Sequence, residues 1–138
     1  MILFVDTSVW SLAFRRDAGP DRPETARLRS AIGDPSRDTI LTTGIVLQEL
    51  LQGFAGPRQR AALLGVLSAV PLLVPGRPSH VRAAELRNRC RRAGVQLGTI
   101  DALTAQLCVE HAVMLLTTDM DFTHASRHCP LMVWRPGH

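Results

Sequence analysis

The chain has 138 residues, 46% of them hydrophobic, which suffices for one domain with a buried core and no disulfide support. No apolar run approaches the ~20 residues of a membrane helix, and Asp6 ends the first run before a secretory signal forms, so we expect a soluble, cytoplasmic protein. The formal charge of +4 includes 16 basic residues, all arginine, which favours an anionic partner and excludes a lysine-dependent P-loop. A GC-rich genome also explains an arginine-only composition, so this support for nucleic acid is mild.

Short apolar segments alternate with helical patterns along the chain. In chain order, the predicted elements are a strand at Ile2–Val5, a helix from Thr7 or Ser8 to Phe14, a helix at Glu24–Ile32, a strand at Thr39–Leu41, helices at Ile45–Phe54 and Arg58–Ala69, a strand at Leu72–Val74, helices at Ser79–Ala93 and Ile100–His111, a strand at Val113–Leu116, a short helix at Asp121–Arg127 and an edge strand at Leu131–Trp134. Ser79 and Thr99 are expected to cap helices, and Gly94 to end one in the left-handed conformation. This alternation predicts an α/β fold with a mostly parallel sheet covered on both faces, in a single domain over residues 1–138.

Four acidic residues lie near strand–helix junctions or about one turn inside a helix: Asp6, Glu49, Asp101 and Asp119. The carboxyl ends of parallel strands meet at one edge of a sheet, where ligands bind, so acids far apart in sequence can converge there. Converging carboxylates raise one another's pKa unless a cation compensates them. Carboxylate oxygens suit Mg²⁺ or Mn²⁺, which often serve phosphate chemistry. The pattern therefore indicates a metal-dependent enzyme that acts on phosphodiesters.

Three of these positions also have a structural interpretation. Asp6 is a favoured N-cap residue, although a neighbouring hydroxyl can cap the helix and leave the carboxylate free. Glu49 lies beside an apolar helical stripe, where a solvated glutamate is about as well supported as a ligand. Of Asp119 and Asp121, one is expected to cap the short helix that follows, which leaves the other for a metal.

Asp101 is the acid that a structural role explains least. At helical spacing it shares a face with Thr104, Ala105 and Cys108, whose small side chains are expected to bury it. A buried aspartate is rare unless it is paired or binds metal. Its place in the first helical turn favours the ionised form, so the ligand interpretation ranks above simple helix stabilisation.

Other chemical patterns are weaker. His124 and His128 have the i, i+4 spacing of a zinc pair but lack the HExxH pattern, so a pair that binds no metal is favoured. The arginines of Arg87–Arg92 form either a solvated helix face or a track for phosphates. The three cysteines form no CxxC pair, which is typical of reduced structural thiols.

Four segments together resemble the PIN-domain family, and within it the VapC-type toxins of bacterial toxin–antitoxin modules. They are Ile2–Ser8 (ILFVDTS), Val46–Gly53 (VLQELLQG), Asp101–His111 (DALTAQLCVEH) and Leu115–Phe122 (LLTTDMDF). No single segment is specific, but the ordered set covers nearly the whole chain. Thr104 stands where the family usually carries an apolar residue, which affects packing rather than chemistry. The resemblance implies an α/β/α sandwich with a short, mostly parallel sheet and an acidic active site at its carboxyl edge.

The resemblance further implies a Mg²⁺- or Mn²⁺-dependent endoribonuclease that hydrolyses RNA with a metal-activated water. Matched motif by motif, the implied catalytic residues are Asp6, Glu49, Asp101 and Asp119. Of these, Asp6, Asp101 and Asp119 are the implied metal ligands. The implied accessory residues are Asp121, Ser8 and Thr118. The implied partners are RNA, a VapB-type antitoxin and a second copy in a homodimer, with no membrane. Two alternatives stay open: a structure-specific DNA or RNA nuclease of the same fold, and a non-catalytic RNA-binding module, against which the four acids argue.

Overall fold

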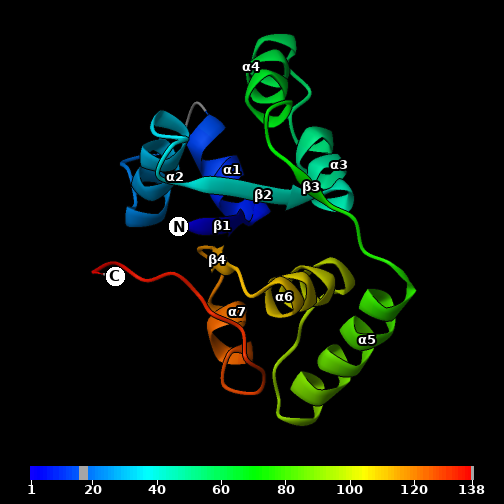
Figure 1. Ribbon diagram of the computed structural model, residues 1–138. Helices are drawn as coiled ribbons and strands as arrows, with labels where there is room; N and C mark the ends of the chain where they lie inside the picture. The colour runs from blue at the N-terminus through cyan, green and yellow to red at the C-terminus, as the bar shows by residue number, and fades with distance from the viewer. Residues whose placement is uncertain (16–18, 138) are drawn as a thin grey trace.

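A four-stranded parallel sheet forms the centre of the computed structural model, which describes residues 1–15 and 19–137 (Figure 1). The strands are β1 (Ile2–Val5), β2 (Thr39–Thr43), β3 (Leu72–Leu73) and β4 (Met114–Leu116). Their spatial order is β3-β2-β1-β4. Because β1 lies between β2 and β4, the residue that follows it is flanked by the loops that follow its two neighbours.

Helices connect the strands and cover the sheet (Figure 1). They are α1 (Thr7–Phe14), α2 (Pro23–Gly33), α3 (Gly44–Gln52), α4 (Pro57–Leu67), α5 (Arg77–Arg92), α6 (Thr99–His111) and α7 (Met120–Ala125). Within the described residues, none of these helices is long and apolar enough to cross a membrane.

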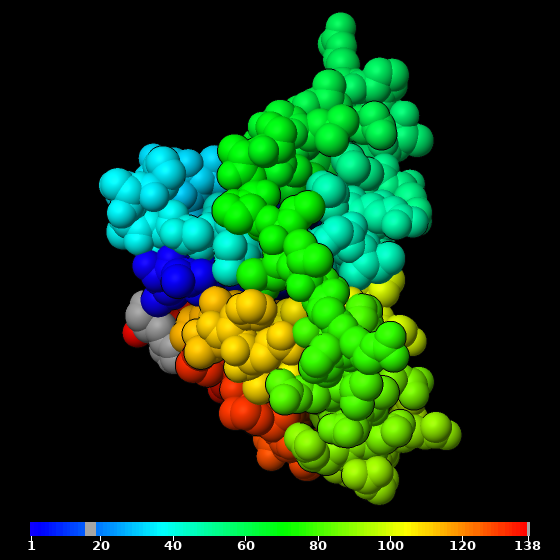
Figure 2. All heavy atoms as spheres, turned by 45° about the vertical axis from the view of Figure 1, so that its right-hand side comes forward, coloured from blue at the N-terminus to red at the C-terminus, as the bar shows by residue number. Residues whose placement is uncertain are grey.

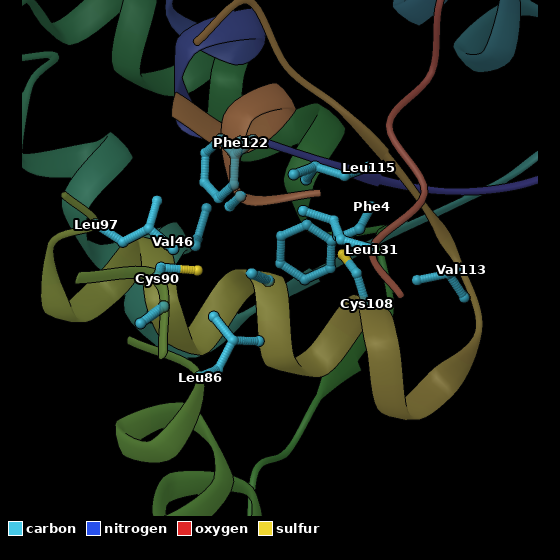
Figure 3. Packing of buried hydrophobic residues seen from close by; sticks show 13 residues of the cluster. Phe4, Val46, Leu86, Cys90, Leu97, Cys108, Val113, Leu115, Phe122 and Leu131 are labelled. Atoms are coloured by element: carbon cyan, nitrogen blue, oxygen red, sulfur yellow. The ribbon is translucent and has the colours of Figure 1, made fainter. Parts of the chain in front are cut away.

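The side chains of β1 alternate between two hydrophobic cores, because successive residues of a strand point to opposite faces of the sheet. Leu3 and Val5 pack in one core with side chains from α1, α2 and α4. Phe4 packs in the other core with side chains from α5, α6 and α7 (Figure 3). The α3 helix supplies Val46 to the second core and Leu50 to the first. The predicted α/β sandwich with a parallel sheet is confirmed.

The helices agree with their predicted positions to within a few residues, but the predicted capping roles of two residues are wrong. Gly76 and Gly98 occupy the N-cap positions of α5 and α6. Thr99 is therefore the first residue inside α6. Ser79 lies inside α5 and is buried, and its Oγ donates a hydrogen bond of 2.9 Å to Oε2 of Glu110 on α6. A serine expected to stabilise its own helix instead joins two helices.

The prediction for the end of helix α5 is confirmed, and the prediction of a last strand is wrong. Gly94 has φ of +83°, so the predicted left-handed residue after α5 is confirmed. The predicted edge strand at Leu131–Trp134 is wrong, because only an isolated parallel bridge joins Leu115 to Val133. The backbone N–H of Leu115 donates to the carbonyl of Met132, and that of Trp134 donates to the carbonyl of Leu115, each at 2.8 Å. This segment therefore lies along β4 and bonds to it at one position, but it does not form a fifth strand among the described residues.

Candidate active site

Asp6 lies at the carboxyl end of β1 with its side chain almost buried, at 6% exposure for the residue. Its Oδ2 accepts hydrogen bonds from Ser8 Oγ at 2.7 Å and from Thr117 Oγ1 at 2.8 Å. Asp6 occupies the N-cap position of α1, but its carboxylate makes no capping hydrogen bond. The prediction that a neighbouring hydroxyl caps α1 is therefore wrong: the Ser8 hydroxyl binds the carboxylate. Within the described residues, no side chain donates to Oδ1, although the backbone N–H groups of Thr7 and Ser8 also act on the carboxylate and lower its pKa.

A second group of hydrogen bonds joins the loop after β4 to the loop after β1. The backbone N–H of Thr118 donates to Ser8 Oγ at 3.1 Å, and that of Asp119 donates to Thr117 Oγ1 at 3.0 Å. Asp119 is the N-cap of α7, and its Oδ1 accepts from the backbone N–H of Asp121 at 2.9 Å. One oxygen of Asp119 thus caps the helix, and its second oxygen and the exposed Asp121 carboxylate are left for other contacts.

The structure brings Glu49 to the same edge of the sheet. Its Oε1 accepts a hydrogen bond of 3.0 Å from Oγ1 of Thr7, the residue that follows Asp6. Glu49 itself is exposed on α3, so it lies at the rim of the acidic site. Thr7 and Thr117 both have orienting roles that the predicted site residues omitted. The predicted residue Thr118 contributes its backbone rather than its hydroxyl.

Asp101 shows that the acids lie close enough to act on one another. Its pKa is raised to about 6, first by burial and then by the negative charges of the neighbouring acids, which are Asp6, Asp119, Glu49 and Asp121. Asp101 is half-buried in the first turn of α6, and the predicted face of Thr104, Ala105 and Cys108 beneath it is buried. The pKa of Asp6 is also raised by burial, against the opposing effect of hydrogen bonds from Ser8 and Thr117.

The structure shows no basic partner for these acids among the residues that it describes. Within residues 1–15 and 19–137, no ion pair involves any of them. Over the same residues, no three His, Cys, Asp or Glu side chains are grouped so that they could hold one metal ion directly. A hydrated cation still fits, because Mg²⁺ usually keeps several waters and is bound through one or two carboxylates. Such a cation would offset the negative charges that raise the pKa of Asp101. Among the described residues, both side-chain donors to Asp6 bind Oδ2 and none binds Oδ1.

The fold and the site define an open parallel α/β protein with an acidic centre at the carboxyl edge of its sheet. The PIN domain family model matches residues 3–127, so the chain belongs to the PIN domain family. A comparison with curated protein sequences found no match.

Solved structures with the same fold include VapBC2 from Rickettsia felis, bound to a DNA fragment from its promoter. That structure has a TM-score of 0.73 and 23% identity over 98% of this chain and 100% of the other. FitAcB from Neisseria gonorrhoeae has a TM-score of 0.67 and 19% identity over 100% and 99% of the two chains. VapC20 from Mycobacterium tuberculosis, a sarcin-ricin loop cleaving toxin, has a TM-score of 0.65 and 24% identity over 89% and 94%.

Proposed function

We propose that this chain is a metal-dependent endoribonuclease and the toxin of a toxin–antitoxin module, acting on RNA in the cytoplasm. The observation that carries the proposal is the uncompensated acidic centre at the carboxyl edge of the sheet. There Asp101 has a pKa raised to about 6 by burial and by four neighbouring acids, with no basic partner among the described residues. Such a centre attracts a divalent cation, and a divalent cation brings phosphodiesters into reach.

The roles of the residues follow from their positions. Asp6, Asp101 and Asp119 would hold Mg²⁺ or Mn²⁺, one or two of them directly and the rest through bound water. Glu49 and Asp121 add negative charge at the exposed rim. When bound, the cation lowers the pKa of water and neutralises charge that develops on the scissile phosphate. The hydroxyls of Ser8 and Thr117 bind Oδ2 and hold the Asp6 carboxylate in one orientation. No protein nucleophile is required.

Two further points support the proposal. The family match spans residues 3–127, and one protein with the same fold, VapC20, is a toxin that cleaves the sarcin-ricin loop. All four predicted acids are present, which argues against a decayed, non-catalytic RNA-binding module. A nuclease of the same fold that cuts DNA is the remaining competitor, and the choice of substrate separates the two.

The test is cleavage of a structured RNA and of a DNA of the same sequence. Cleavage of the RNA is expected to vanish in EDTA and to return with Mg²⁺ or Mn²⁺, whereas Ca²⁺ binds and supports cleavage poorly. The products are expected to carry 5′-phosphate and 3′-hydroxyl ends. Asp21→Asn, at an exposed acid before α2, is the control variant and is expected to cleave RNA as wild type does. Cleavage of the DNA alone, or rescue by zinc alone, would contradict the proposal.

The proposed antitoxin partner fits a groove between α3 and α4. This groove has a volume of about 510 Å³ and includes Leu47, Leu51 and Arg60. Four of its lining residues belong to the apolar segment Leu47–Phe54, and Arg60 directly precedes the apolar segment Ala61–Val70. The sequence predicts that these two segments carry more apolar surface than one small core covers. VapBC and FitAB complexes are among the structures with this fold. We propose that an amphipathic segment of a VapB-type antitoxin lies in this groove.

The carboxyl-terminal half of the antitoxin alone is expected to inhibit cleavage. A basic side chain of the bound antitoxin segment can reach the acids and displace metal. Leu51→Asp is expected to weaken the complex in a pull-down without changing RNA cleavage, since Leu51 is not among the acids. Glu49→Gln is expected to weaken both the antitoxin complex and RNA cleavage. An antitoxin fragment without effect at saturating concentration would contradict this partner. The homodimer stays a prediction.

A further inference from the structure

Helix α5 carries a large excess of positive charge. Its 16 residues contain one acid, Glu85, and six arginines, which are Arg77, Arg82, Arg87, Arg89, Arg91 and Arg92. Within the part of the chain that the structure describes, no α5 arginine forms an ion pair, whereas arginines of other segments do. This helix therefore presents unpaired positive charge to an anionic partner.

A groove of about 480 Å³ runs between α5 and α6. These two helices lie side by side along one flank of the molecule (Figure 2). From α5, the groove is lined by His80, Ala84 and Arg87, which share one face because they are spaced by four and three residues. Ile100 and Leu103 of α6 line it from the other side. The floor is therefore mostly aliphatic, with a cationic residue at its edge.

The groove lies next to the acidic centre. Two of its lining residues, Ile100 and Ala102, are the chain neighbours of Asp101. A third, Ile45, is four residues before Glu49 on α3, so the two occupy the same face of that helix. On α6, however, Thr99, Ile100, Ala102 and Leu103 line the groove from the helix face opposite Asp101. A molecule in the groove therefore approaches the acidic centre from the side of Glu49.

Arg87 is held in place at this groove. Its Nε donates a hydrogen bond of 2.9 Å to the carbonyl oxygen of Leu97, in the loop before α6. The side chain is half-buried, and its two terminal nitrogens make no other hydrogen bond within the described residues. A fixed guanidinium with free nitrogens can bind a phosphate or stack on a base.

We propose that the α5–α6 groove receives one unpaired nucleotide of the RNA, on the Glu49 side of the acidic centre. The base lies on the aliphatic floor formed by Ala84, Ile100 and Leu103, and Arg87 contacts the base or its phosphate. The remaining α5 arginines follow the RNA backbone away from the site. This inference rests on the proposed ribonuclease function and deepens it, because it assigns the segment that selects unpaired RNA.

The observations favour RNA over a peptide as the occupant. The helix beside the groove offers five positive charges in excess over its single acid, which matches a polyphosphate backbone. A duplex cannot insert a paired base into the groove, whereas an unpaired base can be turned out and stacked. An acidic peptide is the alternative occupant, and the experiment below distinguishes it.

The test measures binding of a fluorescein-labelled hexauridylate to the full-length protein in EDTA, by fluorescence anisotropy. Ala84→Phe fills the groove at an exposed position, and Arg87→Gln removes the fixed charge. Each is expected to raise Kd about tenfold, the size of one lost base-stacking or charged contact. Arg87→Gln is also expected to lower the slope of log Kd against log salt by about 1. Arg58→Gln, an exposed arginine of α4, is the charge-matched control with less than about a twofold effect.

Calorimetric titration with Mn²⁺ in parallel separates this inference from the proposed function. Ala84→Phe is expected to bind Mn²⁺ as wild type does, since the acids are unchanged. Unchanged hexauridylate binding by both groove variants would overturn the inference and leave the metal site intact. Failure of wild type to bind the hexauridylate would overturn it too, as would displacement of the RNA from the groove by duplex RNA or an acidic hexapeptide at equal concentration.

Discussion

Asp6 and Asp38 are both almost buried aspartates at opposite edges of the same sheet, at 6% and 4% exposure, yet their surroundings differ. Asp38 precedes β2 at the amino edge, where both its oxygens accept hydrogen bonds of 2.9 Å from Arg27. Arg37 Nε donates to the same carboxylate at 2.9 Å, and the amino-terminal ammonium lies 3.4 Å from it. The side-chain donors that bind Asp6 at the carboxyl edge, among the described residues, are two uncharged hydroxyls.

The pKa of each residue follows from these surroundings. The Arg27 guanidinium holds the pKa of Asp38 well below its usual range, whereas burial raises the pKa of Asp6. At the amino edge the protein supplies its own cations, so the carboxylate stabilises the fold. At the carboxyl edge, further acids lie near Asp6, and among the described residues none of these acids forms an ion pair. The same residue type is thus structural at one edge and, in our proposal, functional at the other.

The largest expected effect is on catalysis at the carboxyl edge. Asp6→Asn and Asp101→Asn are each expected to lower RNA cleavage by about a thousandfold, because each removes a charge that stabilises the reacting centre. Far-ultraviolet circular dichroism should show an unchanged fold. The rate is measured by single-turnover cleavage with Mg²⁺, with Asp21→Asn as control. An Asp101→Asn protein with wild-type activity would remove Asp101 from the site.

The corresponding substitution at the amino edge is expected to affect stability. Asp38→Asn leaves Arg27 and Arg37 without their carboxylate, and we expect the free energy of unfolding to fall by about 3 kcal/mol. Urea denaturation measures this. Asp21→Asn, which breaks the exposed pair with Arg29, is the matched control and is expected to cost less than about 1 kcal/mol. Equal losses in the two variants would show that the amino-edge cluster is no more than a surface ion pair.

A smaller effect separates the two threonines after β4. Thr117→Val removes a hydroxyl that donates to Asp6, so the pKa of Asp6 is expected to rise further and cleavage to fall by about tenfold. The acidic limb of the pH–rate profile is expected to move to higher pH. Thr118→Val should change neither the rate nor the profile, because Thr118 contributes its backbone N–H. A larger loss in Thr118→Val would reverse these assignments.

The smallest effect is the pH dependence of stability without metal. The pKa of Asp101 is about 6 in the fold and 3.8 when unperturbed, so between these values the folded state holds the proton more tightly. The contribution of Asp101 to stability is therefore full below pH 4 and is lost as pH rises through 6. Asp38 has a lowered pKa, so its contribution is present above pH 4 and lost at lower pH.

Asp101→Asn is accordingly expected to melt like wild type at pH 4 and about 3 °C higher at pH 7 in EDTA. Saturating Mg²⁺ should stabilise wild type and reverse the order at pH 7, since a ligand that binds only the folded state raises its melting temperature. Differential scanning calorimetry at the two pH values measures both effects. A melting difference that does not depend on pH would contradict the electrostatic origin of the raised pKa.

Several features of the fold follow from local sequence. The run Ile2–Val5 is apolar throughout and forms β1 with the predicted bounds, because a strand buried on both faces needs no polar position. Gly94 adopts the predicted left-handed conformation, which glycine reaches without steric cost. The alternation of strands and helices predicted a parallel sheet, and with it the edge at which Asp6 and Asp119 would meet.

The outcomes that local sequence did not predict depend on residues distant along the chain. Serine is a favoured capping residue, but Ser79 donates a hydrogen bond to Glu110 on another helix. Thr117, which follows β4, donates to Asp6, which follows the neighbouring strand β1. Capping and strand propensities describe a residue's own segment, whereas these hydrogen bonds depend on which segments pack together.

The sequence by itself determined the acids, the fold class and the family, because local periodicity and ordered motifs specify them. Only the tertiary structure decided that Asp38 is neutralised while Asp6 is not. Both are aspartates beside a strand, and the difference lies in which side chains surround them. Arg27 reaches Asp38 from α2, whereas acids from α3, α6 and the loop after β4 surround the carboxyl end of β1. A charge is structural or functional according to its neighbours in space, which only the packing of the helices on the sheet establishes.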